Sequence, residues 1–133
     1  MDNRNILIDT SVIIDFLRKK NKRKSALWDI KAGYNCFMSV ISEFELWAGA
    51  LTEQKKEDIT KIVKWIKPIP FDSSIAEISA RFHQDLKSRN EGIEFRDIFI
   101  AATALYHKYP LATLNIKHFG RFPEIRIFPG IPA

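Results

Sequence analysis

Hydrophobic residues follow two different spacings along this chain, and the two spacings alternate from one end to the other. Short continuous apolar runs, typical of strands that are buried on both faces, occur over residues 6–8 and 111–114. Between such runs, apolar residues return every three or four positions, most clearly from Lys55 to Ile66, as they do on one face of a helix. Strands that alternate with helices predict an α/β fold with a small central, mainly parallel sheet.

Turn and capping residues set the expected limits of each element. We predict strands over 5–9, 36–39 and 111–114, an extended piece between Pro68 and Pro70, and an edge strand over 126–128. Helices are expected over 11–17, 25–31, 42–49, 55–66, 72–89 and 97–105. Ser11 and Ser42 are the expected N-caps of the first and third helices, which would place Glu45 in a first helical turn. Repeats and linkers are absent from the sequence, so a single domain over residues 1–133 is expected.

The composition limits the classes of protein that this chain can belong to. With 133 residues, 46% of them hydrophobic, the chain is long enough to close one core. Its single cysteine, Cys36, excludes an internal disulfide and suits a reducing compartment. No stretch reaches the roughly 18 consecutive apolar residues of a membrane span. We therefore expect a cytoplasmic protein without a membrane partner.

Positive charge exceeds negative charge, and part of the excess is concentrated. The chain has 21 Lys and Arg against 16 Asp and Glu, a net charge of +5, which favours a polyanionic partner. Residues 18–24, called the basic cluster below, are all cationic except Asn21. This cluster is either a solvated helix end favoured by the helix dipole or a strip that contacts phosphates. The sequence leaves both interpretations open.

Three acidic residues lie in sequence that otherwise looks like protein core. Asp9 directly follows the apolar run 6–8, and in open α/β sheets ligands bind at the carboxyl ends of the strands. Glu45 and Asp97 stand within apolar helical segments. Two carboxylates about 5 Å apart repel each other by roughly 3 kcal/mol at an effective dielectric constant near 20, so a chain rarely gathers three without a cation. Oxygen ligands without a cluster of His and Cys predict a hard divalent cation such as magnesium rather than zinc.

Each acid also has a purely structural interpretation. Asp9 would serve as a helix cap, and Glu45 as a first-turn charge favoured by the helix dipole. Glu43 is the better candidate for that second role, because two helical positions lie roughly 200° apart and only one of them can face the site. Asp97 would be an ordinary residue at a helix start, although so apolar a helix rarely turns a carboxylate inward without a partner.

Five further polar residues each have a site role and a structural role to be weighed. Thr10 and Ser11 either hydrogen-bond the site or simply cap the first helix. Thr113 is expected to be a buried hydroxyl, and His118 a packed or solvent-facing side chain, rather than site residues. Arg96 either contacts a phosphate or pairs with a carboxylate, and the sequence does not separate these two roles.

Another enzyme class also fits part of the pattern. A strand that ends in Asp9-Thr10-Ser11 is compatible with aspartyl-phosphate chemistry, in which a carboxylate acts as the nucleophile. That class requires a second Asp two residues after the first, and Ser11 occupies this position. A phosphatase-like enzyme is therefore disfavoured.

Taken in order, the motifs resemble those of PIN-domain ribonucleases of the VapC toxin type. The resemblance covers nearly the whole chain. It runs through residues 9–17, then 39–42 with Glu45, Leu46 and Gly49, then Asp97 with 100–102 and Ala104, then 112–113 with Asn115, His118 and Phe119.

The resemblance implies a three-layer α/β/α PIN-like fold, a magnesium or manganese cofactor, and endonucleolytic cleavage of RNA. It also implies a homodimer and a cognate antitoxin that inserts into the active-site groove. The implied catalytic residues are Asp9, Glu45, Asp97 and Asn115, with the three acids as metal ligands. The family pattern selects Glu45 over Glu43, because the acid precedes Leu and stands four residues before Gly. Asn115 departs from the fullest form of the pattern, which often has a fourth acid here. The alternative is an inert PIN module that binds RNA or a protein partner without cleaving.

Overall fold

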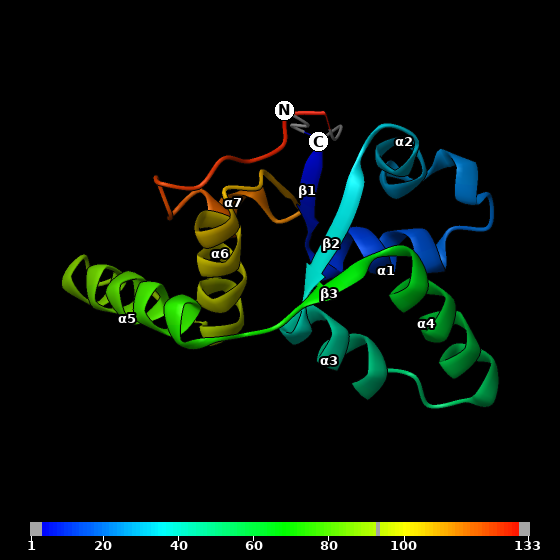
Figure 1. Ribbon diagram of the computed structural model, residues 1–133, viewed down its shortest axis with the longest axis horizontal. Helices are drawn as coiled ribbons and strands as arrows, with labels where there is room; N and C mark the ends of the chain where they lie inside the picture. Colours follow the sequence, from blue (N-terminus) through cyan, green and yellow to red (C-terminus); the bar gives the residue numbers. More distant parts are fainter. Residues whose placement is uncertain (1–3, 93, 131–133) are drawn as a thin grey trace.

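A four-stranded parallel sheet forms the centre of the computed structural model, which describes residues 4–92 and 94–130 (Figure 1). The strands are β1 (Asn5–Ile8), β2 (Asn35–Ser39), β3 (Lys67–Ile69) and β4 (Leu111–Ala112), in the spatial order β3-β2-β1-β4. Leu7 of the central strand β1 lies opposite Phe37 on one side and Leu111 on the other. All three strand pairs are parallel, which confirms the predicted sheet.

Helices cover both faces of the sheet and make the expected three layers. Figure 1 shows α1, α2 and α4 on one side of the sheet and α5, α6 and α7 on the other. The helices are α1 (Thr10–Arg18), the short 3-10 helix η1 (Lys22–Lys24), α2 (Ala26–Gly33), α3 (Val40–Ala48), α4 (Glu53–Trp65), α5 (Ser73–Ser88), α6 (Phe95–His107) and α7 (Ile116–Phe119). Within the described ranges, no helix combines the length and apolar character needed to cross a membrane.

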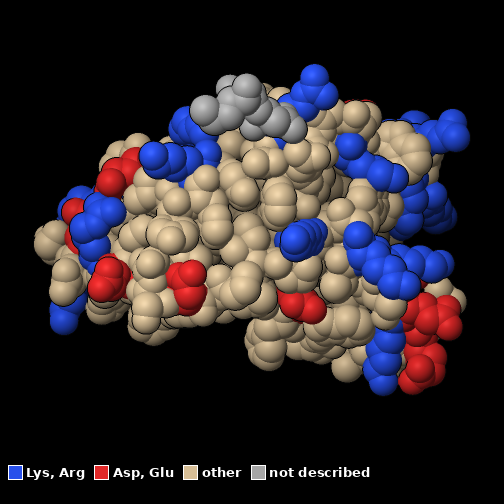
Figure 2. Space-filling view, viewed as in Figure 1, with Lys and Arg blue, Asp and Glu red and all other residues tan. Residues whose placement is uncertain are grey.

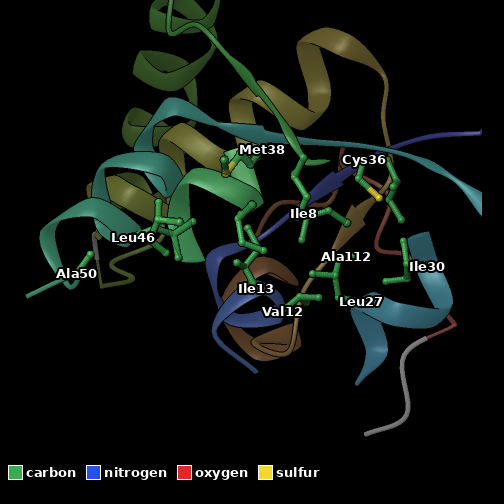
Figure 3. Close-up of a cluster of buried hydrophobic side chains, with 14 residues drawn as sticks. Ile8, Val12, Ile13, Leu27, Ile30, Cys36, Met38, Leu46, Ala50 and Ala112 are labelled. Carbon is green, nitrogen blue, oxygen red and sulfur yellow. The ribbon is translucent and has the colours of Figure 1, made fainter. Parts of the chain in front are cut away.

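Two hydrophobic clusters hold the layers together, one on each face of the sheet. Ile6 and Ile8 pack into the cluster beneath α1, α2 and α4, part of which is drawn in Figure 3. Leu7, between them, packs into the cluster beneath α5 and α6. All three side chains are fully buried. Successive residues of a strand point to opposite faces, so a strand that is covered on both faces is apolar at every position. The apolar run stops at Ile8, where β1 ends, and Asp9 follows directly.

Two helices have other N-caps than the sequence predicts, and both begin earlier. Asp9, not Ser11, occupies the N-cap position of α1, although its side chain makes no capping hydrogen bond. Ser39, not Ser42, caps α3 by accepting a hydrogen bond from the Ile41 N–H. The prediction failed at Ser42 because Ser39 ends β2 in an extended conformation and its hydroxyl reaches the first helical N–H groups before Ser42 does. Ser42 is therefore buried inside α3, and Glu45 lies in the second turn rather than the first.

The chain after α6 also departs from the prediction. Strand β4 ends at Ala112, and the expected edge strand over 126–128 is reduced to a single parallel bridge between Leu111 and Ile127. The short helix α7 was not predicted, because four residues are too few to show a helical spacing of apolar side chains. Residues 131–133, the end of the Pro-rich stretch that follows this bridge in the sequence, lie outside the described residues.

Candidate functional site

The three predicted acids meet at the carboxyl end of the sheet, although they come from three separate elements. Asp9 directly follows β1, Glu45 lies on α3, and Asp97 lies in the first turn of α6. Asp9 and Asp97 are fully buried, and the Glu45 side chain is 29% exposed. All three carboxylates surround one side chain, the guanidinium of Arg96. The sequence analysis left two roles open for Arg96, and the structure assigns it to the carboxylates.

Every nitrogen of the Arg96 guanidinium donates to an oxygen of this site. Nε donates to Glu45 Oε2 at 2.7 Å, and Nη1 to Asp97 Oδ1 at 2.6 Å. Nη2 lies 3.0 Å from Glu45 Oε1 and 3.2 Å from both Asp9 Oδ1 and Thr10 Oγ1. One cationic group therefore bridges three carboxylates that stand far apart in the sequence. Acids that share one cation have oxygens directed at a common centre.

Burial and charge shift the pKa values of two of these groups in the same direction. Burial raises the pKa of Asp97, and this effect outweighs the lowering by Arg96 and His118. Burial alone would lower the pKa of Arg96, but the hydrogen bond to Glu45 and the charges of Asp9, Glu45 and Asp97 together raise it above its ordinary value. The charged form of Asp97 is thus less favourable here than in water, even beside Arg96. Additional positive charge would stabilise the site.

Two hydroxyl groups fix the orientation of Asp9. Ser11 Oγ donates to Asp9 Oδ2 at 2.7 Å, and Thr113 Oγ1 donates to the same oxygen at 2.9 Å. Each hydroxyl in turn accepts a backbone N–H, Ser11 from Leu114 and Thr113 from Asn115. A hydroxyl that already accepts an N–H directs its own proton toward its remaining partner. Ser11 and Thr113 therefore belong to the site, although the sequence predicted a purely structural role for Thr113.

A second hydroxyl pair holds Glu45. Thr10 Oγ1 lies 2.7 Å from Glu45 Oε1 and 2.8 Å from Ser42 Oγ. Because Thr10 has one hydroxyl proton, it donates to Glu45 and accepts from Ser42. Glu43 faces away and accepts a hydrogen bond from Trp47 Nε1 on the exposed side of α3. The choice of Glu45 over Glu43 as the inward-facing acid agrees with this geometry.

Asn115 borders the site through its backbone, because its N–H donates to Thr113 Oγ1, which in turn donates to Asp9. It is exposed at the N-cap of α7, and among the described residues its side chain forms no hydrogen bond with the three acids. His118, one turn later, reaches the site instead, with Nδ1 3.1 Å from Asp97 Oδ2. Arg121 Nη2 lies 3.5 Å from the same oxygen. The side chain that approaches Asp97 from this segment is thus an imidazole, a role that the sequence analysis did not predict for His118.

Glu94 is a further residue that the sequence analysis missed. Glu94, Asp97 and His118 each offer one ligand atom, and these atoms all lie within 4.8 Å of one another. Among the described residues, this group shares only Asp97 with the predicted triad. Its sequence signal is the separation of Glu94 from Asp97 by three positions, which places the two side chains on one face at the start of α6.

The donor set of the triad fits a hard divalent cation. Asp9, Glu45 and Asp97 supply only carboxylate oxygens, the ligands that magnesium and manganese prefer. The convergence of all three on the Arg96 guanidinium means that their oxygens already surround a positive charge. The single cysteine, Cys36, is buried in the core cluster beneath α1 and α2 and offers no ligand here. These residues therefore fit the cation that the sequence analysis predicts.

Comparison with known proteins places the chain in a family. The family model of the PIN domain matches residues 6–125. Ribonuclease VapC1 of Methanocaldococcus jannaschii is 34% identical over 120 residues, which cover 90% of this chain and 82% of that protein. The crystal structure of FitAcB from Neisseria gonorrhoeae superposes with a TM-score of 0.75 at 30% identity and covers 92% of this chain and 96% of that one. The structure of VapBC-1 from nontypeable Haemophilus influenzae shares the fold, with a TM-score of 0.82 at 23% identity over 93% of this chain and 96% of that one. The chain belongs to the PIN-domain family and, within it, to the VapC type that its motifs resemble.

Proposed function

We propose that this protein is a magnesium- or manganese-dependent endoribonuclease, the toxin of a VapBC-type toxin–antitoxin pair. The observation that carries the proposal is the convergence of Asp9, Glu45 and Asp97 on one cationic group at the carboxyl end of a parallel sheet. A relative with 34% identity is named as a ribonuclease, which supports the same activity. Residues 1–133 act as a single domain in this proposal.

The three acids hold the metal in this proposal, and the hydroxyl groups hold the acids. Bound there, a divalent cation would supply Lewis acidity toward the phosphodiester and neutralise charge on its oxygens. Ser11 and Thr113 keep Asp9 in one orientation through their hydrogen bonds to Oδ2. Loss of such a hydrogen bond to a metal ligand typically lowers metal affinity or activity 10- to 100-fold. Asn115 contributes its backbone N–H to Thr113, and its exposed amide is available to the RNA.

The basic cluster is proposed to bind the RNA backbone. Arg18, its first residue, lines a cavity of about 260 Å³ that Glu45 also lines, so the cluster begins beside one of the three acids. Figure 2 shows Lys and Arg side chains gathered along the side of the molecule that η1 and α2 form. Trp28, 38% exposed, lies on this side with Arg23 and Lys31 within 5.9 Å of its ring. Exposed aromatic rings beside cations suit bases and phosphates of a single strand.

Two exposed apolar surfaces are proposed to bind protein partners. The first includes Phe44 and Leu51, 69% and 82% exposed, which directly adjoin in sequence the cavity-lining residues Glu45 and Ala50. We assign this surface to a cognate antitoxin. One related structure, 26% identical, is described as a toxin–antitoxin complex from Klebsiella pneumoniae. The second surface lies over α5 and α6 and includes the rings of Phe71, Phe95 and Phe99. Phe99 stacks on Phe95 and meets Phe71 edge to face, and we assign this surface to a homodimer. Apolar patches of this kind on folded proteins mark interaction sites.

Incubation of the purified protein with labelled single-stranded RNA tests the proposed activity. We expect cleavage in millimolar manganese or magnesium and none in excess chelator. An Asp9→Asn variant, purified in the same way, controls for contaminating nucleases and should be inactive. RNA that binds but stays intact under all metal conditions would contradict the enzyme and favour the inert PIN module.

A further inference from the structure

Arg96 fills the space between the three acids of the proposed metal site. Its Nε, Nη1 and Nη2 atoms all donate to site oxygens, from Glu45 Oε2 at 2.7 Å to Asp9 Oδ1 and Thr10 Oγ1 at 3.2 Å. The side chain is 27% exposed, so Arg96 is not sealed within the core. A bidentate pairing with Glu45 and a charge-assisted bond to Asp97 are the strong forms of such contacts. This arginine therefore already supplies a positive charge to the centre.

The three carboxylates, whose oxygens fit a divalent cation chemically, are spaced in this structure around the larger guanidinium. Magnesium binds oxygen at 2.0–2.1 Å, so two oxygens on one ion lie no more than about 4 Å apart. Among the described residues, the group whose ligand atoms all lie within 4.8 Å of one another is Glu94, Asp97 and His118. That group contains neither Asp9 nor Glu45, whose oxygens are arranged around the larger guanidinium. A single ion bound by all three acids must take the place of the guanidinium and draw the oxygens closer together.

We propose that Arg96 is an internal counter-ion that competes with the divalent metal for Asp9, Glu45 and Asp97, so that the metal binds by displacing this guanidinium. The inference rests on the proposed function, because it assumes that the triad is the metal site. When only a fraction of the molecules has a site that can bind the metal, the apparent Kd equals the intrinsic Kd divided by that fraction. Arg96 thus sets the metal concentration at which the protein becomes active.

Manganese affinity, measured by electron paramagnetic resonance, tests the competition without any measurement of cleavage. Arg96→Gln should bind Mn²⁺ at least about tenfold more tightly than wild type, as expected if the competent state is a minor one. Arg96→Lys keeps the charge on one nitrogen, which cannot bridge three acids, and should fall between the two.

Arg121→Gln is the matched control for a simple charge effect. It removes a cation that lies 3.5 Å from Asp97 Oδ2 but contacts neither Asp9 nor Glu45. Its affinity for Mn²⁺ should rise clearly less than that of Arg96→Gln. An equal rise in the two variants would overturn the displacement, because a loss of positive charge anywhere near Asp97 would then explain both results.

Nuclear magnetic resonance of the arginine Nε–H groups in wild-type protein tests the displacement directly, and the variants serve only to assign the Arg96 signal. The Arg96 signal, assigned as the one missing from Arg96→Gln or Arg96→Lys, should lose its protection from solvent exchange when Mg²⁺ saturates the protein. A signal that stays protected while Mg²⁺ binds would overturn the displacement and leave the metal site intact. Absence of divalent binding in wild type and in both Arg96 variants would overturn the metal site itself, and the displacement with it.

Discussion

Replacing Asp97 by Asn separates the chemistry of the site from the stability of the fold. The two side chains have nearly the same shape, and Asp97 is fully buried, so the substitution opens no cavity. The remaining Oδ1 still accepts from Arg96 Nη1, which lies 2.6 Å away in wild type. The new amide group donates toward His118 Nδ1, 3.1 Å from the oxygen that it replaces. What the variant loses is the negative charge.

The sign of the stability change follows from the pKa of Asp97. Burial raises this pKa above its ordinary value of 3.8 despite the opposing charge of Arg96. The folded state therefore disfavours the charged carboxylate, by about 1.4 kcal/mol for each unit of the rise. A neutral amide avoids this cost, so the melting temperature of Asp97→Asn in chelator should equal or exceed that of wild type. Cleavage of RNA should nevertheless fall at least about 100-fold, because a charged metal ligand is lost.

The dependence of stability on pH gives the same reasoning a second check. Between pH 3.8 and the raised pKa, the folded protein retains the Asp97 proton that the unfolded chain has released. The free energy of unfolding therefore falls as the pH rises through this window. Asp97→Asn should remove the part of this decline in the free energy of unfolding that Asp97 causes. Urea unfolding of wild type and variant at several pH values measures it.

Thermal unfolding in chelator and RNA cleavage in manganese are the two assays. Asp85→Asn is a suitable control, because it neutralises an exposed acid on α5 that pairs with Arg89. A melting temperature for Asp97→Asn more than about 4 °C below wild type, corresponding to roughly 1 kcal/mol for a domain of this size, would refute the pKa argument. Cleavage within tenfold of wild type would refute the role of Asp97 in the metal site.

Three other predictions test separate parts of the structure. Glu45→Gln should lower RNA cleavage at least about 100-fold. Glu43→Gln should leave cleavage nearly unchanged, because Glu43 accepts a hydrogen bond from Trp47 on the exposed side of α3. The opposite result would mean that Glu43, not Glu45, belongs to the metal site. Replacing three of the four lysines of the basic cluster, Lys20, Lys22 and Lys24, by Gln should make the affinity for single-stranded RNA less dependent on salt, with a slope smaller by about 0.7 for each phosphate that the variant no longer neutralises. An unchanged slope would make the cluster a solvated surface. Burial raises the pKa of Cys36 from 9.0 to about 11. Between these pH values the folded protein keeps a proton that the unfolded chain loses, so the free energy of unfolding should fall as the pH rises. A Cys36→Ala variant with the same decline would contradict this.

The helix starts show how neighbouring strands decide what capping residues alone do not. Ser39 and Ser42 both have hydroxyls that suit an N-cap, and the sequence offers no reason to prefer the first. Pairing of β2 with β3 extends to Ser39, opposite Ile69, and this keeps Ser39 extended where the helix must begin. The start of α3 thus depends on a strand that lies far along the chain.

The sequence by itself determined the fold class and the three acids, because both depend on local patterns. A strand covered on both faces needs apolar residues throughout, so residues 6–8 identify β1 and mark Asp9 at its end. The PIN-type motifs then identified Glu45 and Asp97. Only the tertiary structure decided what surrounds these acids. Arg96 lies 87 positions from Asp9 and 51 positions from Glu45 in the sequence, yet it hydrogen-bonds both. These contacts form because α3, α6 and the end of β1 meet in space, and the sequence does not show which distant side chains such a meeting brings together. The contact of His118 with Asp97 was not predicted for the same reason, since the four-residue α7 leaves no periodic signal and its direction is set by packing of Phe119 into the core.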